Sequence, residues 1–271
     1  MYDNQLNRMS KRRIAMMLAG LAVAAVVVLV AWPRKQQVDG RVVLRGAPPP
    51  EIKVLLDPAT ARLRPNGLTT RHYLVSSNGG LANTFIWIKS GLSNYATKPA
   101  SDRPVMEFRL TQLEPYVLGV LTNQPVRFRN TDPLLHNCHC TPKAIGNREV
   151  NFSMPTAMPT SEPWYKALYR RFITRRPAPI TGIDHSFSTP EPFVRVKCDV
   201  HPWEFGYVCV TDHPFFAITD KDGRFRMPGE LPPGNYVMEA RHLRCGVLTQ
   251  EIVLRRGDHK QVEFVFDVPK R

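Results

Sequence analysis

Residues 193–203 read FVRVKCDVHPW, and the alternation of apolar and basic side chains in their first half predicts a β-strand. Val194, Val196 and Cys198 fall on one face, because successive side chains of a strand point to opposite sides. The basic residues between them fall on the other face. Cys198 is therefore expected on the buried face at the end of a strand, shortly before His201.

A second alternating stretch lies earlier in the chain, where residues 126–132 read VRFRNTD. Val126 and Phe128 fall on one face of this stretch, and two arginines fall on the other. The chain then leads within a few residues to His136 and Asn137. Two predicted strands are thus followed closely by side chains of the kind that bind metals.

Short strands separated by proline and glycine account for most of the remaining chain. The 271 residues include 25 prolines and no long stretch of helical periodicity beyond the N-terminus, which favours an all-β fold. We expect a Greek-key β-sandwich over residues 40–212, with a basic, proline-rich excursion at 159–190. Turn signals such as Asp222-Gly223 predict a second, small β-sandwich unit over residues 213–271.

Two stretches near the start of the body are weakly patterned. Residues 51–80 and 91–112 are expected to be mainly loops, with a strand over residues 83–92 (NTFIWIKSGL) between them.

An uncharged apolar run covers residues 14–32 (IAMMLAGLAVAAVVVLVAW). About 20 apolar residues in a helix cross the hydrocarbon core of a bilayer. Basic residues between Arg8 and Arg13 favour a cytoplasmic N-terminus. We therefore expect a cytoplasmic tail at 1–13, one transmembrane helix at 14–32, a tether at 33–39 and a body outside the cytoplasm. Cleavage of the run as a secretory signal would export the body equally.

Composition excludes several classes of function. The formal net charge of +14 favours an acidic partner or surface. The sequence has no recognition helix and no aromatic RNA-binding platform, so no nucleic-acid partner is expected. It also lacks a nucleophile elbow, a zinc-protease helix, a phosphate-binding glycine loop and paired glycosidase carboxylates. We therefore predict no enzyme activity and identify no small-molecule substrate.

The residues that can carry chemistry are a histidine at one strand end and a Cys-x2-His pair at another. A tight loop between two strands can hold Cys198 and His201 side by side. A copper site needs two imidazoles and a thiolate in nearly one plane, and His136 would complete that set. A closed zinc site built from His136, Cys140, Cys198 and His201 is an alternative. A buried thiol beside a hydrogen-bonded histidine, without metal, is another.

Because of the His-Asn pair and the later Cys-x2-His motif, residues 38–212 resemble a cupredoxin, the blue-copper fold. In that family a His-Asn pair and a later Cys-x2-His supply three copper ligands. The resemblance implies that His136, Cys198 and His201 hold copper. It also implies that Asn137 ties the two ligand loops together through hydrogen bonds.

The C-terminal segment DHPFFAITDKDGRF…LPPGNY resembles the carboxypeptidase regulatory-like, transthyretin-type β domain, which occurs in bacterial envelope proteins. The joined pattern HN…KCDVHPW…DHPFFAIT…LPPG resembles bacterial proteins described as plastocyanin-like or carboxypeptidase regulatory-like.

The axial position departs from the cupredoxin pattern, because Glu204 stands where the family would read methionine after His-Pro-Trp. A carboxylate is a harder ligand than a thioether and favours Cu(II), so a lower reduction potential is expected. Met154 and Met158 are further candidates to approach the metal, although filling apolar space is the simpler role for both. His139 is expected next to the predicted ligands, where it would contact them and not the metal.

Five cysteines leave at least one thiol outside any disulfide within the chain. Cys138 and Cys140 project in parallel from one strand, so a bridge between them is not expected. A bridge from either to Cys209 or Cys245 is the more plausible pairing.

The sequence thus predicts a single-pass inner-membrane protein with its body in the periplasm, binding copper for one-electron transfer. Its basic body would suit an acidic partner such as a cytochrome or a respiratory complex. Two alternatives remain open. One is a metal-free structural or interaction subunit of a membrane complex, and the other is a copper storage or delivery protein in which Cys138, His139 and Cys140 hold Cu(I).

Overall fold

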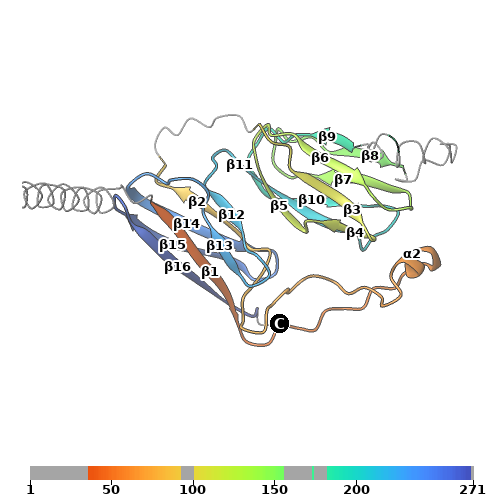
Figure 1. Ribbon diagram of the computed structural model, residues 1–271, viewed down its shortest axis with the longest axis horizontal. Coiled ribbons are helices and arrows are strands. Elements are labelled where there is room, and N and C mark those ends of the chain that lie inside the picture. The colour runs from red at the N-terminus through yellow and green to blue at the C-terminus, as the bar shows by residue number, and fades with distance from the viewer. Residues whose placement is uncertain (1–35, 93–100, 156–172, 174–181, 270–271) are drawn as a thin grey trace, which may run out of the picture.

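The computed structural model describes residues 36–92, 101–155, 173 and 182–269, and its described strands form four sheets that pair into two β-sandwiches (Figure 1). The predicted all-β fold is confirmed. The predicted transmembrane helix at 14–32 and most of the excursion at 159–190, with Met158 just before it, lie outside the described residues. Among the helices of the described ranges, none is long and apolar enough to cross a membrane.

The first sandwich carries the residues predicted to bind metal. One of its sheets has the strand order β5-β11-β10-β7-β8. The bounds are β5 Val117–Leu121, β11 Phe205–Thr211, β10 Glu191–Lys197, β7 His136–Thr141 and β8 Val150–Met154. The facing sheet has the order β4-β3-β6-β9. Its strands are β4 Gln112–Glu114, β3 Val105–Arg109, β6 Val126–Asn130 and β9 Gly182–His185. A buried core that includes Phe108, Phe128 and Val196 lies between the two sheets.

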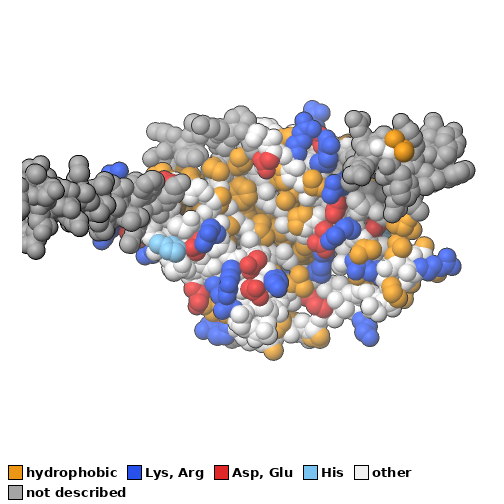
Figure 2. All heavy atoms as spheres, viewed as in Figure 1, with side chains coloured by type: hydrophobic (Ala, Val, Ile, Leu, Met, Phe, Trp, Pro, Cys, Tyr) orange, Lys and Arg blue, Asp and Glu red, His pale blue; other side chains and the backbone are white. Residues whose placement is uncertain are grey.

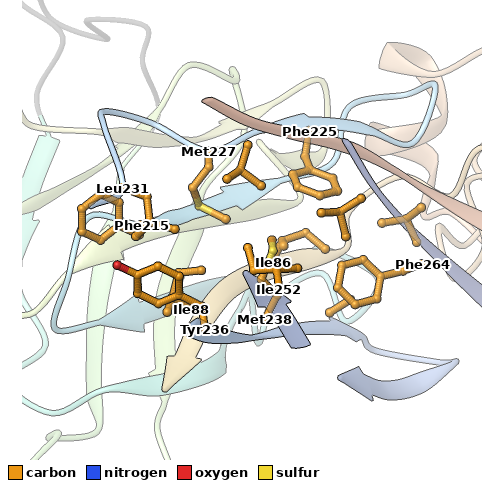
Figure 3. Close-up of a cluster of buried hydrophobic side chains, with 14 of the residues drawn as sticks. Ile86, Ile88, Phe215, Phe225, Met227, Leu231, Tyr236, Met238, Ile252 and Phe264 are labelled. Carbon is orange, nitrogen blue, oxygen red and sulfur yellow. The ribbon is translucent and has the colours of Figure 1, made fainter. Parts of the chain in front are cut away.

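The second sandwich has a three-stranded sheet, β13-β1-β16, and a four-stranded sheet, β12-β2-β14-β15. The strands of the first are β13 Arg224–Arg226, β1 Gln37–Arg45 and β16 His259–Asp267. The strands of the second are β12 Phe216–Ile218, β2 Phe85–Ser90, β14 Gly234–His242 and β15 Gly246–Leu254. Figure 3 shows its core, where Ile86 and Ile88 from β2 lie among Met238, Ile252 and Phe264 from the C-terminal strands.

Strand pairing corrects the predicted composition of the two units. The sequence placed β1 and β2 in the first unit, which was expected to cover residues 40–212. In the structure β1 pairs in parallel with β16 along its whole length, and β2 pairs with β12 and β14. The second sandwich is therefore built from both ends of the described chain, and the first sandwich is inserted between them. The reason is that strand alternation reports burial but not which distant strand is the partner.

Three further local expectations were wrong. β1 begins at Gln37, inside the predicted tether. β3 lies within residues 91–112, which were expected to be loop, and β4 begins at the last residue of that range. β9 lies within the predicted excursion and pairs with β6. A short helix, α2 Pro58–Leu63, begins after Asp57, whose side chain accepts hydrogen bonds from the first helical N–H groups.

The two sandwiches contact each other through an aromatic cluster between the outer faces of β5 and β11 and those of β2 and β12. Phe85 and Trp87 of β2 stack with ring centroids 4.6 Å apart. Gly119 of β5 lies so close to the Phe216 ring that an added Cβ would meet it at 2.4 Å. The absence of a side chain at Gly119 is thus what allows the two sheets to approach at this point.

A buried histidine at the end of β14 makes the stability of this fold depend on pH. His242 is 4% exposed, and its Nδ1 accepts the backbone N–H groups of Arg244 and Cys245. Burial, with the charge of Arg244, lowers the pKa of His242 to about 4. The unfolded chain takes up this proton near pH 6.5, so stability falls as the pH drops from there to about 4.

We expect the free energy of unfolding to lose up to about 3 kcal/mol through this group over that interval. Urea unfolding of the wild type and of His242→Asn at pH 7.5 and 4.5 measures the loss. The variant should lose about 2 to 3 kcal/mol less than the wild type between the two pH values. Equal losses of stability in the two proteins would mean that folding does not lower the pKa of His242.

Candidate metal centre

The candidate centre lies at one end of the first sandwich, where the loop before β7 meets the loop between β10 and β11. Asn130, the last residue of β6, shapes the first loop. Its side-chain amide donates to the carbonyls of Leu134 and Met154, and its Oδ1 accepts the N–H of Asp132. This turn delivers His136 to the first position of β7, with its side chain facing the core.

The second loop, residues 198–204, is closed by two backbone hydrogen bonds. The N–H of Cys198 donates to the carbonyl of Glu204, and the N–H of Glu204 donates to the carbonyl of His201, both at 2.9 Å. Such a tight loop turns all three side chains toward the same side. It is the compact connection that the Cys-x2-His spacing predicted.

Four potential metal-binding side chains meet between the two loops. The ligand atoms of His136, Cys198, His201 and Glu204 all lie within 4.8 Å of one another, and all four residues are buried. Sγ of Cys198 lies 3.8 Å from Nδ1 of His136 and 3.8 Å from Nδ1 of His201. The two Nδ1 atoms are 3.2 Å apart. The structure thus brings together the four residues proposed from the sequence.

These spacings fit a common ion. With bonds of about 2.0 Å to nitrogen and about 2.3 Å to sulfur, a trigonal arrangement separates sulfur from each nitrogen by about 3.7 Å. Both sulfur–nitrogen distances in the structure, 3.8 Å, are close to this value. The nitrogen–nitrogen distance of 3.2 Å is shorter than equal angles would give, so an ion here would subtend a smaller angle between the two nitrogens than between sulfur and either nitrogen.

The carboxylate of Glu204 supplies a fourth donor. Oε2 lies 2.7 Å from Nδ1 of His136, and Oε1 lies 3.8 Å from Nδ1 of His201. The side chain is completely buried, yet neither oxygen accepts a hydrogen bond from the described residues, because the short contact with His136 lacks hydrogen-bond geometry. A buried carboxylate without a donor is strongly unfavourable unless a cation compensates it. The donor set therefore fits a positive ion at its centre.

The electrostatics of His136 lead to the same conclusion. Burial by itself would lower the pKa of His136, but contacts with Asp132, Cys198 and Glu204 outweigh burial and raise it to about 11. Burial lowers the pKa of the neighbouring His201. The raised pKa favours the protonated form of His136 beside these acidic groups when no metal is bound. A metal cation bound at Nδ1 would take the place of that positive charge.

Sequence reasoning missed two supports of His136. Oδ2 of Asp132 lies 3.4 Å from Nε2 of His136, on the side away from the other donors. Asp132 is itself held by the N–H groups of Leu110 and Thr111. The ring of Phe108 stacks on His136 with centroids 4.8 Å apart and planes 12° apart. The Asn-x-Asp spacing before His136 was a usable signal for Asp132, whereas nothing local marked Phe108.

Asn137 connects the two loops, as the resemblance implied. Its Oδ1 accepts the N–H of Asp199 at 2.7 Å and lies 3.4 Å from Sγ of Cys198. Its Nδ2 donates to the carboxylate of Asp199 at 2.8 Å. His139 lies on the outer face of β7 and binds Asp199 and Glu149 through its two ring nitrogens. It therefore supports Asp199 rather than offering a ligand to the centre.

The structure corrects two predictions about cysteines. Cys138 and Cys140 point into the first core with their sulfur atoms 4.0 Å apart, and neither belongs to the group of four donors. The zinc site that includes Cys140 is therefore not formed. All five cysteines are free. The expected bridge to Cys209 or Cys245 is absent because Cys209 lies in the aromatic cluster between the sandwiches and Cys245 packs against the second core.

Of the two methionines considered as axial ligands, only Met154 can be placed. It is buried at the end of β8, directly opposite His136 in the β7–β8 register.

No protein-family model and no curated protein sequence matches the chain. Solved structures that are similar to part of it include an oxidised amicyanin variant, at 16% identity and TM-score 0.29, covering 46% of this chain and 98% of amicyanin. A purple cupredoxin from Nitrosopumilus maritimus matches at 15% identity and TM-score 0.27, covering 40% of this chain and 99% of that protein. A copper-containing nitrite reductase from Thermus scotoductus SA-01 matches at 14% identity and TM-score 0.29, covering 45% of this chain and 25% of that enzyme. At such identities and TM-scores the likeness adds no evidence about metal or function.

Proposed function

We propose that this protein binds one copper ion through His136, Cys198, His201 and Glu204 and passes single electrons through it. The observation that carries the proposal is the pocket itself: one thiol, two imidazoles and a carboxylate without hydrogen-bond donors, all buried within 4.8 Å. A thiolate with two imidazoles is the donor set of copper electron-transfer sites. Copper, when bound, supplies the change between the Cu(II) and Cu(I) states.

The side chains around the pocket favour electron transfer over catalysis. Catalytic metal sites keep a position open for water or substrate, whereas these four donors complete a four-coordinate set. Asp132 lies within ion-pair distance of His136, Phe108 stacks on the His136 ring, and Asn137 connects the two loops through hydrogen bonds. A site fixed in this way changes little when the ion changes charge. We therefore propose a redox carrier with no enzymatic activity of its own.

The proposal also includes the cellular location of the protein and its redox partner. The apolar run at 14–32 would anchor the chain in the inner membrane, with both sandwiches in the periplasm. The formal charge of +14 would attract an acidic redox partner such as a cytochrome or another respiratory subunit. On the face seen in Figure 2, basic side chains are scattered among acidic ones. Attraction by net charge should weaken as salt is added.

Copper loading tests the function directly. The full-length protein, purified without metal, is titrated with Cu(II) and followed by visible absorption and by metal analysis. We expect one copper per chain and an intense thiolate-to-copper band that disappears on reduction and returns on oxidation.

The other outcomes separate the rival functions. Tight binding of Cu(I) without the band would favour copper storage or delivery. Tetrahedral binding of Zn²⁺ in preference to copper would favour a structural metal site. Absence of stoichiometric metal would leave a structural or interaction subunit.

A further inference from the structure

An extended arm, residues 51–72, reaches from the second sandwich toward the metal-centre end of the first. It follows β1 and carries α2 at its far end, and Figure 1 shows it running beneath the first sandwich. Its two legs pair with each other: the N–H of Val54 donates to the carbonyl of Leu68, and the N–H of Thr70 donates to that of Ile52. Glu51 closes the base by accepting hydrogen bonds from Thr70 and from the backbone of Tyr73.

Two arginines attach the arm to the first sandwich. Nη1 of Arg71 pairs with Glu114 at 2.6 Å, and its guanidinium lies 4.4 Å from the centre of the Tyr116 ring. Arg64, just after α2, donates to the carbonyl of Leu110 at 2.5 Å and to the side chain of Gln112 at 3.0 Å. All of these partners lie on β4 or beside it, at the end of the sandwich where the metal-binding loops meet.

The attached arm lies against Trp203, which belongs to the same loop as Cys198 and His201. Asp57 caps α2 at the far end of the arm. The legs of the arm, including Val54 and Leu68, share a small cavity with Trp203, two residues beyond His201. His201 keeps 7% of its surface exposed.

The apolar side chains of the arm are all exposed or half-buried, so its attachment to the first sandwich depends mainly on polar contacts. Leu55 is 93% exposed and Ile52 is 66% exposed. An open space of about 630 Å³ lies between the legs and Gln112. Segments that bury little apolar surface and depend on a few polar contacts open at much lower free energy than the fold as a whole.

We propose that the arm is a gate on the metal centre: while Arg64 and Arg71 are bound, it restricts access of metal and small solutes to Cys198 and His201. As far as metal exchange is concerned, this inference rests on the copper function proposed above. Opening at the arginine anchors would then set the rate at which copper enters and leaves, and the donors would set how tightly it is held.

Two arm variants test the gate. One is the double substitution Arg64→Ala/Arg71→Ala. In the other, residues 55–67 are replaced by Asn-Gly, a turn that suits the paired legs and removes α2. Arg45→Ala is the matched control, because it removes an exposed bidentate pair with Asp267 in the second sandwich. All are made in the full-length protein.

The first readout needs no metal. Alkylation of Cys198 by iodoacetamide is followed by peptide mass spectrometry, with the half-buried Cys245 of the second sandwich as the reference in the same sample. Loss of the arginine contacts should speed alkylation of Cys198 about tenfold relative to Cys245. Arg45→Ala should leave the ratio unchanged. An unchanged ratio in both arm variants would overturn the gate whether or not copper binds.

The second readout is copper release from the loaded protein to a strong chelator. Release should be faster by a similar factor in both arm variants, with the thiolate-to-copper band unchanged in position. If the wild type binds no copper, the proposed function fails, and the alkylation ratio still decides whether the arm is a gate. If copper binds and release is equally slow in all proteins, the gate is wrong and the copper function stands.

Discussion

Replacing Cys198 with serine is expected to abolish the thiolate-to-copper absorption and to weaken copper binding more than 100-fold. Even the loss of an outer partner of a ligand lowers metal affinity about 10- to 100-fold, and Cys198 is the only sulfur among the four donors. Serine nearly preserves the volume but offers a hydroxyl that does not ionise near neutral pH. Two imidazoles and a carboxylate would remain, and they bind Cu(II) without an intense visible band.

The measurement is a Cu(II) titration followed by absorption and by competition with a chelator of known affinity. Cys245→Ser is the matched control, because this thiol is half-buried and packs against the second core, away from the centre. Its spectrum and affinity should equal those of the wild type. Should Cys198→Ser retain the band, the sulfur that binds copper would have to be another cysteine, and the site proposed here would be wrong.

The candidate site was accessible from the sequence because its signals are local. Cys198, His201 and Glu204 sit in one seven-residue loop, and the alternation that precedes Cys198 shows which face of the strand is buried. His136 stands in the same relation to its own strand, β7, whose inward residues alternate with outward ones. Two local patterns, each ending a strand with metal-binding side chains, were enough to propose that the loops meet.

The sequence could not predict the strand partners of β1 and β2 or the position of the arm. β1 alternates like any half-buried strand, and nothing in residues 37–45 distinguishes pairing with β16 from pairing with a neighbouring strand. The arm mixes polar and apolar residues in nearly equal numbers and contacts the first sandwich mainly through Arg64 and Arg71. Such contacts leave no periodic pattern, since single long side chains on loops make them. Asp57 could be recognised as a helix cap, but the contact of the arm with Trp203 could not be predicted.

Replacing Glu204 with glutamine is expected to raise the reduction potential of the bound copper by on the order of 170 mV. Opposite unit charges about 4 Å apart interact by about 4 kcal/mol at an effective dielectric constant of about 20. For one electron, each tenfold change in relative affinity corresponds to about 59 mV, so losing the anion favours Cu(I) by roughly that potential. Glutamine keeps the size and one carbonyl oxygen, so it removes mainly the charge.

Redox titration of the copper band in wild type and variant measures the shift. Glu149→Gln is the matched control: this carboxylate binds His139 at 2.7 Å, but its side chain is 65% exposed, so water and salt screen its charge. Its substitution should move the potential by much less. A Glu204→Gln potential equal to that of the wild type would mean that the buried carboxylate is neutral or remote from the metal. An increase confined to Glu204→Gln would instead identify this carboxylate as the group that keeps the centre in its oxidised state, in the position where the cupredoxin resemblance led us to expect methionine.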